Sequence, residues 1–211
     1  MIHPDYIRLN RILAGVIFLL SFIVYFDTMA PTVSYWDCGE FIAVAHTLGV
    51  PHPPGSPFFL LLGRVASMIP IGNDVAYRVN ILSPLSSALA VMFLYLIIVQ
   101  VVVHWRGKVE SIHDALVAFG GAIIGSLVFA FTDSHWFNAV EAEVYAISTF
   151  FTAIVVWLIL LWSEKADEAG HERYILIIAY MMGLATGLHL LNLLALPLKQ
   201  MTLHLTPTNI E

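Results

Sequence analysis

The stretch SYWDCGEFIAVAHTLGVPHPPGSP, from Ser34 to Pro57, gathers residues that could do chemistry in an otherwise apolar chain. Asp37 and Glu40 are three residues apart, so a helix would place both carboxylates on one face. A carboxylate in such a position can take a proton as a general base. The same spacing, with Ser34 three residues before Asp37, is also typical of a helix N-terminus that carboxylates cap. General-base chemistry and helix capping therefore both stay open.

A second acidic cluster, NAVEAEVY, contains Glu141, Glu143 and Tyr145 at the start of a long apolar segment. Acidic residues at the border of such a segment are costly in lipid and face protein or a wet cavity. Asn138, with Glu141 three residues later, fits a helix cap. That interpretation leaves Glu143 and Tyr145 without an explanation.

The remaining polar candidates are single residues. His52 lies in the proline-rich HPPGSP segment, where each proline restricts the backbone. Arg64 and Arg78 either anchor the chain at lipid headgroups or bind a phosphate. His189 and Asn192 lie in an apolar stretch, where a buried, hydrogen-bonded pair between helices is the simpler interpretation. HExxH and CxxC motifs are absent, so no metal site is predicted.

The elements that must position these residues cross a membrane. Hydrophobic residues make up 59% of the 211 residues and charged residues 11%, too little polar surface for a soluble globule. A span needs about 20 mostly apolar residues. The sequence predicts an all-α membrane protein with about five spans, at residues 12–29, 82–103, 115–131, 142–162 and 174–198.

The nine Lys and Arg residues predict the orientation. A cytoplasmic N-terminus puts six of them inside, namely Arg8, Arg11, Arg106, Lys108, Lys165 and Arg173. Three then lie outside, namely Arg64, Arg78 and Lys199. This excess of positive charge inside supports a cytoplasmic N-terminus. The net charge of −6 gives no basic surface for nucleic acid.

In this orientation a long extracytoplasmic loop covers residues 30–80, and loops of this length are usually functional. Residues 37–48 read as an amphipathic helix, with Phe41, Val44, Ala45 and Leu48 at helical spacing. Residues 58–69 are apolar but too short to span, and prolines flank them. We expect both segments to be helices at the membrane interface.

The order of these motifs resembles a known family. YWDCGEF in a long outward loop, HPPGSP, NAVEAEVYAIS and GLHLLNLL are similar to the N-terminal part of a multi-pass membrane family, over residues 11–197. Its bacterial members carry a domain of unknown function, and its animal relatives are protein O-mannosyltransferases. The family is similar to the C-class (GT-C) glycosyltransferases, which take a sugar from a polyprenyl-phosphate carrier on the outer side of the membrane.

The resemblance implies roles for individual residues. In the C-class enzymes an acidic residue in the first outward loop is the catalytic base. Asp37 matches that position, with Glu40 as its companion, and the base is expected to be desolvated beneath the loop. The implied substrate-binding residues are His52, Arg64, Arg78, Glu141, Glu143, Tyr145, His189 and Asn192. No cofactor is expected, and a divalent metal is left open.

The predicted organisation is a transmembrane module resembling the GT-C N-terminal part at residues 1–198, followed by a short polar tail at 199–211. Because members of the family are longer, we expect either a glycosyltransferase or its truncated N-terminal module, acting on a hydroxyl of a protein. Its partners would be membrane lipids, the sugar donor and the acceptor. The alternative is a non-catalytic structural subunit of a larger membrane complex. A transporter would need paired charges deep in the spans, where mainly His189 is found.

Overall fold

The structure, a computed structural model, describes residues 4–195 except 165, 167 and 169. Four helical segments among these residues are long and apolar enough to cross a membrane. They are Tyr6–Asp27, Val75–Arg106, Ile112–Ala130 and Val144–Ser163. The predicted all-α membrane fold is confirmed, and the protein is a multi-pass integral membrane protein.

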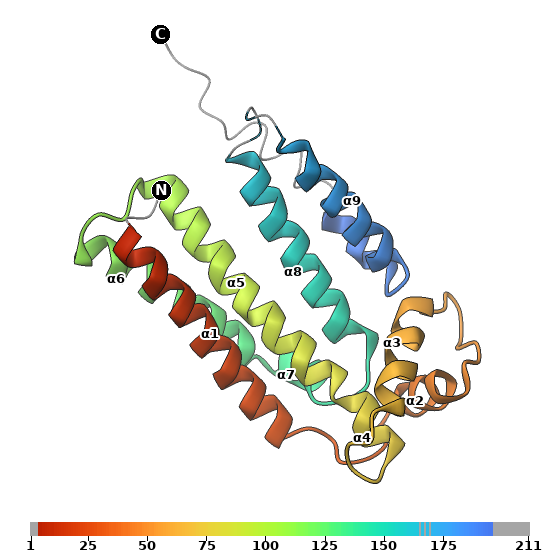
Figure 1. The fold of residues 1–211 in the computed structure, drawn as a ribbon. Coiled ribbons are helices and arrows are strands. Elements are labelled where there is room, and N and C mark those ends of the chain that lie inside the picture. The colour runs from red at the N-terminus through yellow and green to blue at the C-terminus, as the bar shows by residue number, and fades with distance from the viewer. Residues whose placement is uncertain (1–3, 165, 167, 169, 196–211) are drawn as a thin grey trace.

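The spanning helices are α1 (Pro4–Asp27), α5 (Leu82–Arg106), α6 (Ile112–Ala130) and α8 (Val144–Ser163). The central helix α5 packs against α1, α6 and α8 (Figure 1). Tyr25, Tyr95 and Phe119 belong to the core that α1, α5 and α6 share. Apolar side chains such as Ile23 and Ile124 are exposed on the outer faces of α1 and α6, where lipid contacts them.

The loop between α1 and α5 folds into α2 (Cys38–Thr47), α3 (Pro57–Met68) and α4 (Val75–Asn80). These helices lie at the end of the bundle where α1 ends and α5 begins (Figure 1). A second core joins them to α8 and α9, so the loop is part of the packed structure. At Gly63 a Cβ atom would lie 2.8 Å from the Cβ atom of Ala45, so α2 and α3 cross where no larger residue fits.

The predicted loop helices are confirmed, with a small difference at one end. Phe41 and Ala45 of α2 are buried, as the amphipathic pattern requires, but Leu48 follows the helix and is exposed. In α3 the side chains of Leu61, Val65 and Met68 are exposed on one face. A helix with such a face, beside spanning helices, suits the membrane interface.

The predicted fifth span is not one continuous helix. It corresponds to α9 (Glu172–Thr186), of 15 residues, and the 3-10 helix η1 (Leu190–Ala195), which packs against both α8 and α9. The chain turns at residues 187–189, since Phe58 N donates a hydrogen bond to Gly187 O at 2.9 Å. Ser56 Oγ donates to Leu188 O at 3.0 Å. These contacts with the start of α3 are long-range, which is why a uniformly apolar sequence conceals the break.

The ends of the other spanning helices agree with the prediction to within three residues, except that α1 begins at Pro4 and not at residue 12. The segment between the predicted spans 115–131 and 142–162 forms the helix α7 (Asp133–Ala139), at the same end as α2, α3 and α4. The predicted polar tail at 199–211 lies outside the described residues, as do Lys165 and Lys199.

Candidate functional site

The long loop is closed at its base by a buried asparagine. Asn80 Nδ2 donates hydrogen bonds to Ala30 O at 2.8 Å and to Thr32 O at 3.0 Å. Ala30 N in turn donates to Val140 O at 2.8 Å. The beginning of the loop, its end and the segment before α8 are therefore joined, although they are far apart in the sequence.

Neither Asp37 nor Glu40 caps α2. Asp37 occupies the N-cap position, but its side chain makes no cap hydrogen bond. Glu40 accepts hydrogen bonds from the backbone N and the Nδ1 atom of His52, both at 2.7 Å. The capping interpretation is thus wrong for this pair, and Glu40 instead fixes the HPPGSP segment over the start of α2.

Asp37, Glu40 and His52 form an exposed cluster. The Nε2 atom of His52 lies 3.9 Å from Oδ2 of Asp37, and 55% of the Asp37 side chain is exposed. The hydrogen bond with Glu40 raises the pKa of His52, and the same bond lowers the pKa of Glu40. One ligand atom of each residue lies within 4.8 Å of the others, so these three side chains could hold a divalent cation.

The second acidic cluster caps α8, but through a different residue from the one expected. Glu143 is the N-cap, and its Oε2 atom accepts a hydrogen bond from Val144 N at 3.3 Å. Asn138 lies in α7, where its Nδ2 atom donates to Ser134 O at 2.8 Å. The cap predicted at Asn138 is therefore wrong, because α7 occupies that part of the chain.

Glu141 and Glu143 contact the turn that contains Asp37. Ser34 Oγ donates a hydrogen bond to Oε2 of Glu141, and Cys38 Sγ donates to Oε1 of Glu143 at 3.9 Å. Glu141 is 3% exposed and Glu143 is 7% exposed. Burial, reinforced by the charges of Asp37 and Glu141, raises the pKa of Glu143 to about 7. The two acidic clusters thus form one site with an exposed and a buried half.

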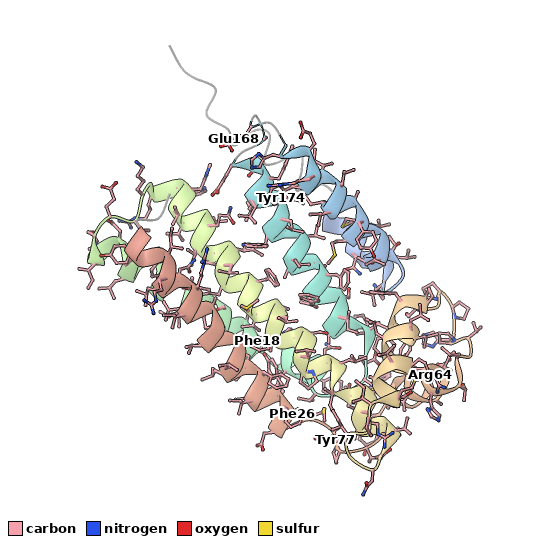
Figure 2. The ribbon with its side chains drawn as sticks, viewed as in Figure 1. Phe18, Phe26, Arg64, Tyr77, Glu168 and Tyr174 are labelled. Carbon is pink, nitrogen blue, oxygen red and sulfur yellow. The ribbon has the colours of Figure 1, made fainter. Side chains whose placement is uncertain are left out.

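The two candidate arginines have different surroundings. All three nitrogens of the Arg78 guanidinium donate to backbone oxygens, of Ser67 at 3.2 Å, Ile71 at 3.1 Å and Gly72 at 3.0 Å. Arg64 donates from one terminal nitrogen to the carbonyl oxygen of His46. Figure 2 shows Arg64 among the loop helices. These contacts favour a structural role for Arg78 and leave Arg64 as the better phosphate ligand.

Tyr145 and His189 lie together beside this region. Their ring centroids are 5.3 Å apart, and 46% of Tyr145 is exposed. His189 follows the turn at Gly187 that contacts the start of α3. Both side chains therefore line the same end of the bundle as the acidic residues, and their part in substrate binding stays a prediction.

Asn192 is a buried structural residue. Its Oδ1 atom accepts hydrogen bonds from Ser148 Oγ at 3.0 Å and Thr152 Oγ1 at 2.9 Å, both in α8. Its Nδ2 atom donates to the carbonyl oxygens of Ala185 and His189, each at 2.9 Å. The expected polar contact between apolar segments is present, and it joins η1 to α8 and α9.

The structure therefore brings five predicted residues into one cluster, namely Asp37, Glu40, His52, Glu141 and Glu143. Within this cluster Asp37 differs from the expectation, because it is exposed where a desolvated base was expected. Outside it, the contacts of Arg78 and Asn192 favour structural roles over the substrate binding that was expected. Sequence reasoning missed Ser34 and Cys38 as partners of the buried carboxylates, and Asn80 as the residue that closes the loop. The available signal was the predicted order of the spans, which puts the 30–80 loop and the start of the 142–162 span on the same side of the membrane.

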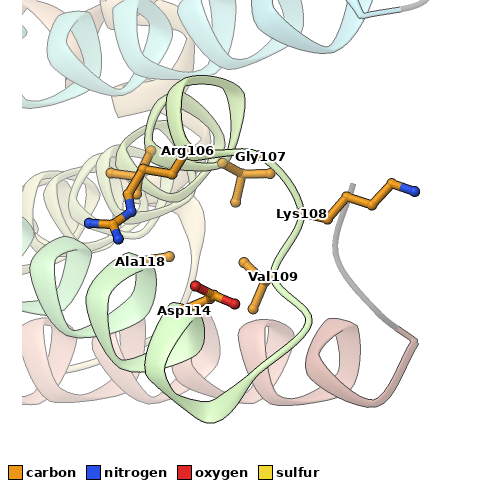
Figure 3. Close-up of a pocket in the computed structure, with 8 residues that line it drawn as sticks. Arg106, Gly107, Lys108, Val109, Asp114 and Ala118 are labelled. Atoms are coloured by element: carbon orange, nitrogen blue, oxygen red, sulfur yellow. The ribbon is translucent and has the colours of Figure 1, made fainter.

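A pocket elsewhere in the molecule contains none of these residues. It lies between the end of α5 and the start of α6, and Arg106, Lys108 and Asp114 line it (Figure 3). At about 1.5 Å per residue, the length of α5 places it some 35 Å from the start of that helix. The acidic cluster at the other end thus remains the candidate site.

The family model of the protein O-mannosyl-transferase TMEM260 N-terminal domain matches residues 37–209. The chain belongs to this family. It is 31% identical over 161 residues to protein O-mannosyl-transferase tmem260 of Dictyostelium discoideum, which covers 75% of this chain and 18% of that protein. With TMEM260 of Mus musculus it shares 30% identity over 163 residues, 77% of this chain and 21% of that protein.

The chain spans about a fifth of the length of these TMEM260 relatives. No solved structure matches it. The part that matches the TMEM260 N-terminal family begins at Asp37, so it includes all the site residues predicted from the sequence but not Ser34. The exposed and buried halves of the site therefore both lie within the region that defines the family.

Proposed function

We propose that this chain forms the catalytic end of a membrane glycosyltransferase that transfers a sugar from a polyprenyl-phosphate carrier to a hydroxyl group of a protein. Its relatives are named protein O-mannosyl-transferases, so mannose is the first sugar to test. The N-terminus is cytoplasmic and the loop helices are extracytoplasmic. The described cations support this orientation, because Arg8, Arg11, Arg106, Lys108 and Arg173 are at the end of the bundle opposite the loop.

The observation that carries the proposal is the availability of Asp37. Glu40 is engaged by two hydrogen bonds from His52, and Glu141 and Glu143 are buried. Asp37 combines an exposed carboxylate with a place in the same cluster. Among the five residues brought together, it is thus the carboxylate that a substrate hydroxyl can reach.

The chemistry needs one such base. The acceptor oxygen attacks the anomeric carbon of the sugar and forms the new glycosidic bond, while Asp37 takes the proton of the hydroxyl. The bond between the anomeric carbon and the phosphate oxygen breaks, and its electron pair leaves with the lipid phosphate. A phosphate is already a good leaving group, so a second carboxyl group is not required as an acid.

Arg64 would offset the negative charge on the departing phosphate. It lies in α3, whose exposed apolar face suits the lipid interface where a carrier lipid would enter. The guanidinium group matches phosphate geometry. His52, Tyr145 and His189 would then contact the sugar or the acceptor, and the proposal requires no cofactor.

The experiment is sugar transfer from polyprenyl-phosphate mannose to hydroxyl-bearing peptides by the purified chain in lipid nanodiscs. Asp37→Asn should lower the rate by about a hundredfold or more, as loss of a general base does. Asp133→Asn is the matched control, since Asp133 is also an exposed aspartate at this end of the bundle. It should transfer at the native rate.

Two results would contradict the proposal. If Asp37→Asn transfers sugar at the native rate, Asp37 is not the base. No transfer by the well-folded native chain, across several sugar donors, would favour the structural-subunit alternative, in which the loop serves only to pack against a larger complex.

A further inference from the structure

The turn that carries Asp37 is attached to the bundle on both sides. Before Asp37, Ser34 donates a hydrogen bond to Glu141, and after it Cys38 donates to Glu143. The separations along the sequence are 107 and 105 residues, so these are tertiary contacts. Glu141 and Glu143 thus bind the two ends of the short turn from Ser34 to Cys38.

The buried carboxylates belong to a rigid support. Glu143 caps α8 through Val144 N, and Glu143 N donates to Glu141 O at 2.9 Å. The spanning helix α8 packs against both α5 and α9. A buried carboxylate is costly unless hydrogen bonds satisfy it, and here its partners include the Asp37 turn. The position of the turn is therefore linked to the end of α8.

The backbone of the turn shows why such a support is needed. Trp36, directly before Asp37, has a φ of 56°, in the left-handed region that non-glycine residues rarely adopt. The Trp36 side chain is 84% exposed, so its own packing does not account for this conformation. Strained residues of this kind persist where the surrounding structure fixes them. The contacts at Ser34 and Cys38 are placed to do so.

We propose that Glu141 and Glu143 are positioning residues, which hold the 34–38 turn against the end of α8 and so fix where Asp37 lies. The consequence for sugar transfer rests on the proposed function. The order of the turn does not, because it can be measured in the absence of any substrate.

The first experiment is hydrogen–deuterium exchange of the native chain in nanodiscs, followed at residues 33–41. Glu141→Ala and Ser34→Ala should each raise exchange there by about tenfold, the equivalent of one lost hydrogen bond. The double variant should exchange no faster than either single variant, since both remove the same contact. Glu141→Gln retains an acceptor for Ser34 and should stay near the native rate.

The Glu143 contact is tested in the same way through Cys38→Ala, which leaves the α8 cap intact. Glu110→Ala is the control, because Glu110 is an exposed glutamate at the opposite end of the bundle. Unchanged exchange in Glu141→Ala, Ser34→Ala and Cys38→Ala would overturn the proposal. So would an increase spread evenly over all helices, since this would mean general destabilisation.

The second experiment measures transfer kinetics. A misplaced base lowers turnover more than substrate binding, so Glu141→Ala should reduce kcat by about tenfold or more with little change in KM. Glu141→Gln should restore most of the activity. If the native chain transfers no sugar, the proposed function fails, whereas the exchange result still decides whether Glu141 and Glu143 position the turn.

Discussion

The two halves of the acidic site contain the same kind of side chain in opposite surroundings. The exposed half, Asp37 and Glu40 with His52, faces solvent, and Nδ1 of His52 lies 2.7 Å from Oε2 of Glu40. In the buried half, Glu141 and Glu143 bind protein hydroxyl, thiol and backbone groups. Under the proposed function this difference suits two tasks, because a base must reach its substrate whereas a support must resist displacement.

Releasing the loop from the bundle would remove the difference in surroundings between the two halves. A variant that releases the loop should therefore show the largest effect. Asn80→Ala removes two hydrogen bonds to Ala30 and Thr32 and leaves two carbonyl groups without a partner. It should lower the free energy of unfolding by about 3 kcal/mol. Asn73→Ala, an exposed asparagine of the same loop, is the matched control.

The measurement for this pair is thermal or denaturant unfolding in detergent micelles, with exchange in both halves of the site as a second readout. In Asn80→Ala both halves should exchange faster. If Asn80→Ala loses no more stability than Asn73→Ala, other contacts hold the base of the loop.

The pH response sharpens the comparison, since the buried half contains a group that titrates near neutrality. The groups that face Glu143 are Asp37, Glu141, Cys38 and His52. Because its pKa is raised to about 7 in the folded state, stability should fall as pH rises from its unfolded pKa through 7. Between pH 5 and 8 we expect a decrease of about 2 kcal/mol.

Glu143→Gln should abolish most of this decrease, because glutamine is neutral at every pH and can still accept the hydrogen bond that caps α8. The test is unfolding of both proteins across this pH range. Equal pH slopes for the native chain and Glu143→Gln would assign the titration to another group.

The strained turn between the two halves provides a smaller effect. Trp36→Gly should raise the free energy of unfolding by about 1 kcal/mol, because glycine adopts a φ of 56° without the cost borne by other residues. Tyr35→Gly is the control, since Tyr35 is equally exposed and has a negative φ. It should be destabilised slightly. If Trp36→Gly is less stable than Tyr35→Gly in unfolding experiments, Trp36 is not strained.

Much of the exposed half could be predicted from the sequence because its signals are local. The apolar spacing of α2, the prolines around α3 and the carboxylates at Asp37 and Glu40 all lie within one loop. The spans were predictable for the same reason, since a bilayer requires long apolar runs. The family resemblance added the catalytic role proposed for Asp37, which spacing alone left open.

The contacts of the buried half could not be predicted, because the partners are more than a hundred residues apart in the sequence. Glu141 and Glu143 have no local sign of a contact with Ser34 or Cys38. The turn at Gly187 was concealed similarly, since contacts with Phe58 and Ser56 break a uniformly apolar segment. The predicted order of the spans puts both acidic clusters on one side of the membrane, and packing determines which residues meet.

The smallest effect we expect comes from the hydrogen bond between Glu40 and His52. Its contribution to stability should depend on pH in a different way from that of Glu143. The pKa of Glu40 is lowered and that of His52 is raised, mainly by their mutual hydrogen bond. The His52 contribution is complete below its unfolded pKa and is lost as pH rises through the raised folded value. The Glu40 contribution is present above its unfolded pKa and is lost as pH falls through the lowered value.

The stability lost in Glu40→Gln should therefore vanish at low pH, be greatest at intermediate pH and decrease again as His52 loses its proton, whereas the Glu143 effect grows until the pH exceeds 7 and then stays constant. The loss should be small, because solvent screens exposed pairs. Unfolding midpoints of Glu40→Gln, with Glu110→Gln as the exposed control, measure it. If the stability lost in Glu40→Gln instead rises steadily with pH, the exposed and buried halves do not differ in the shape of their pH dependence.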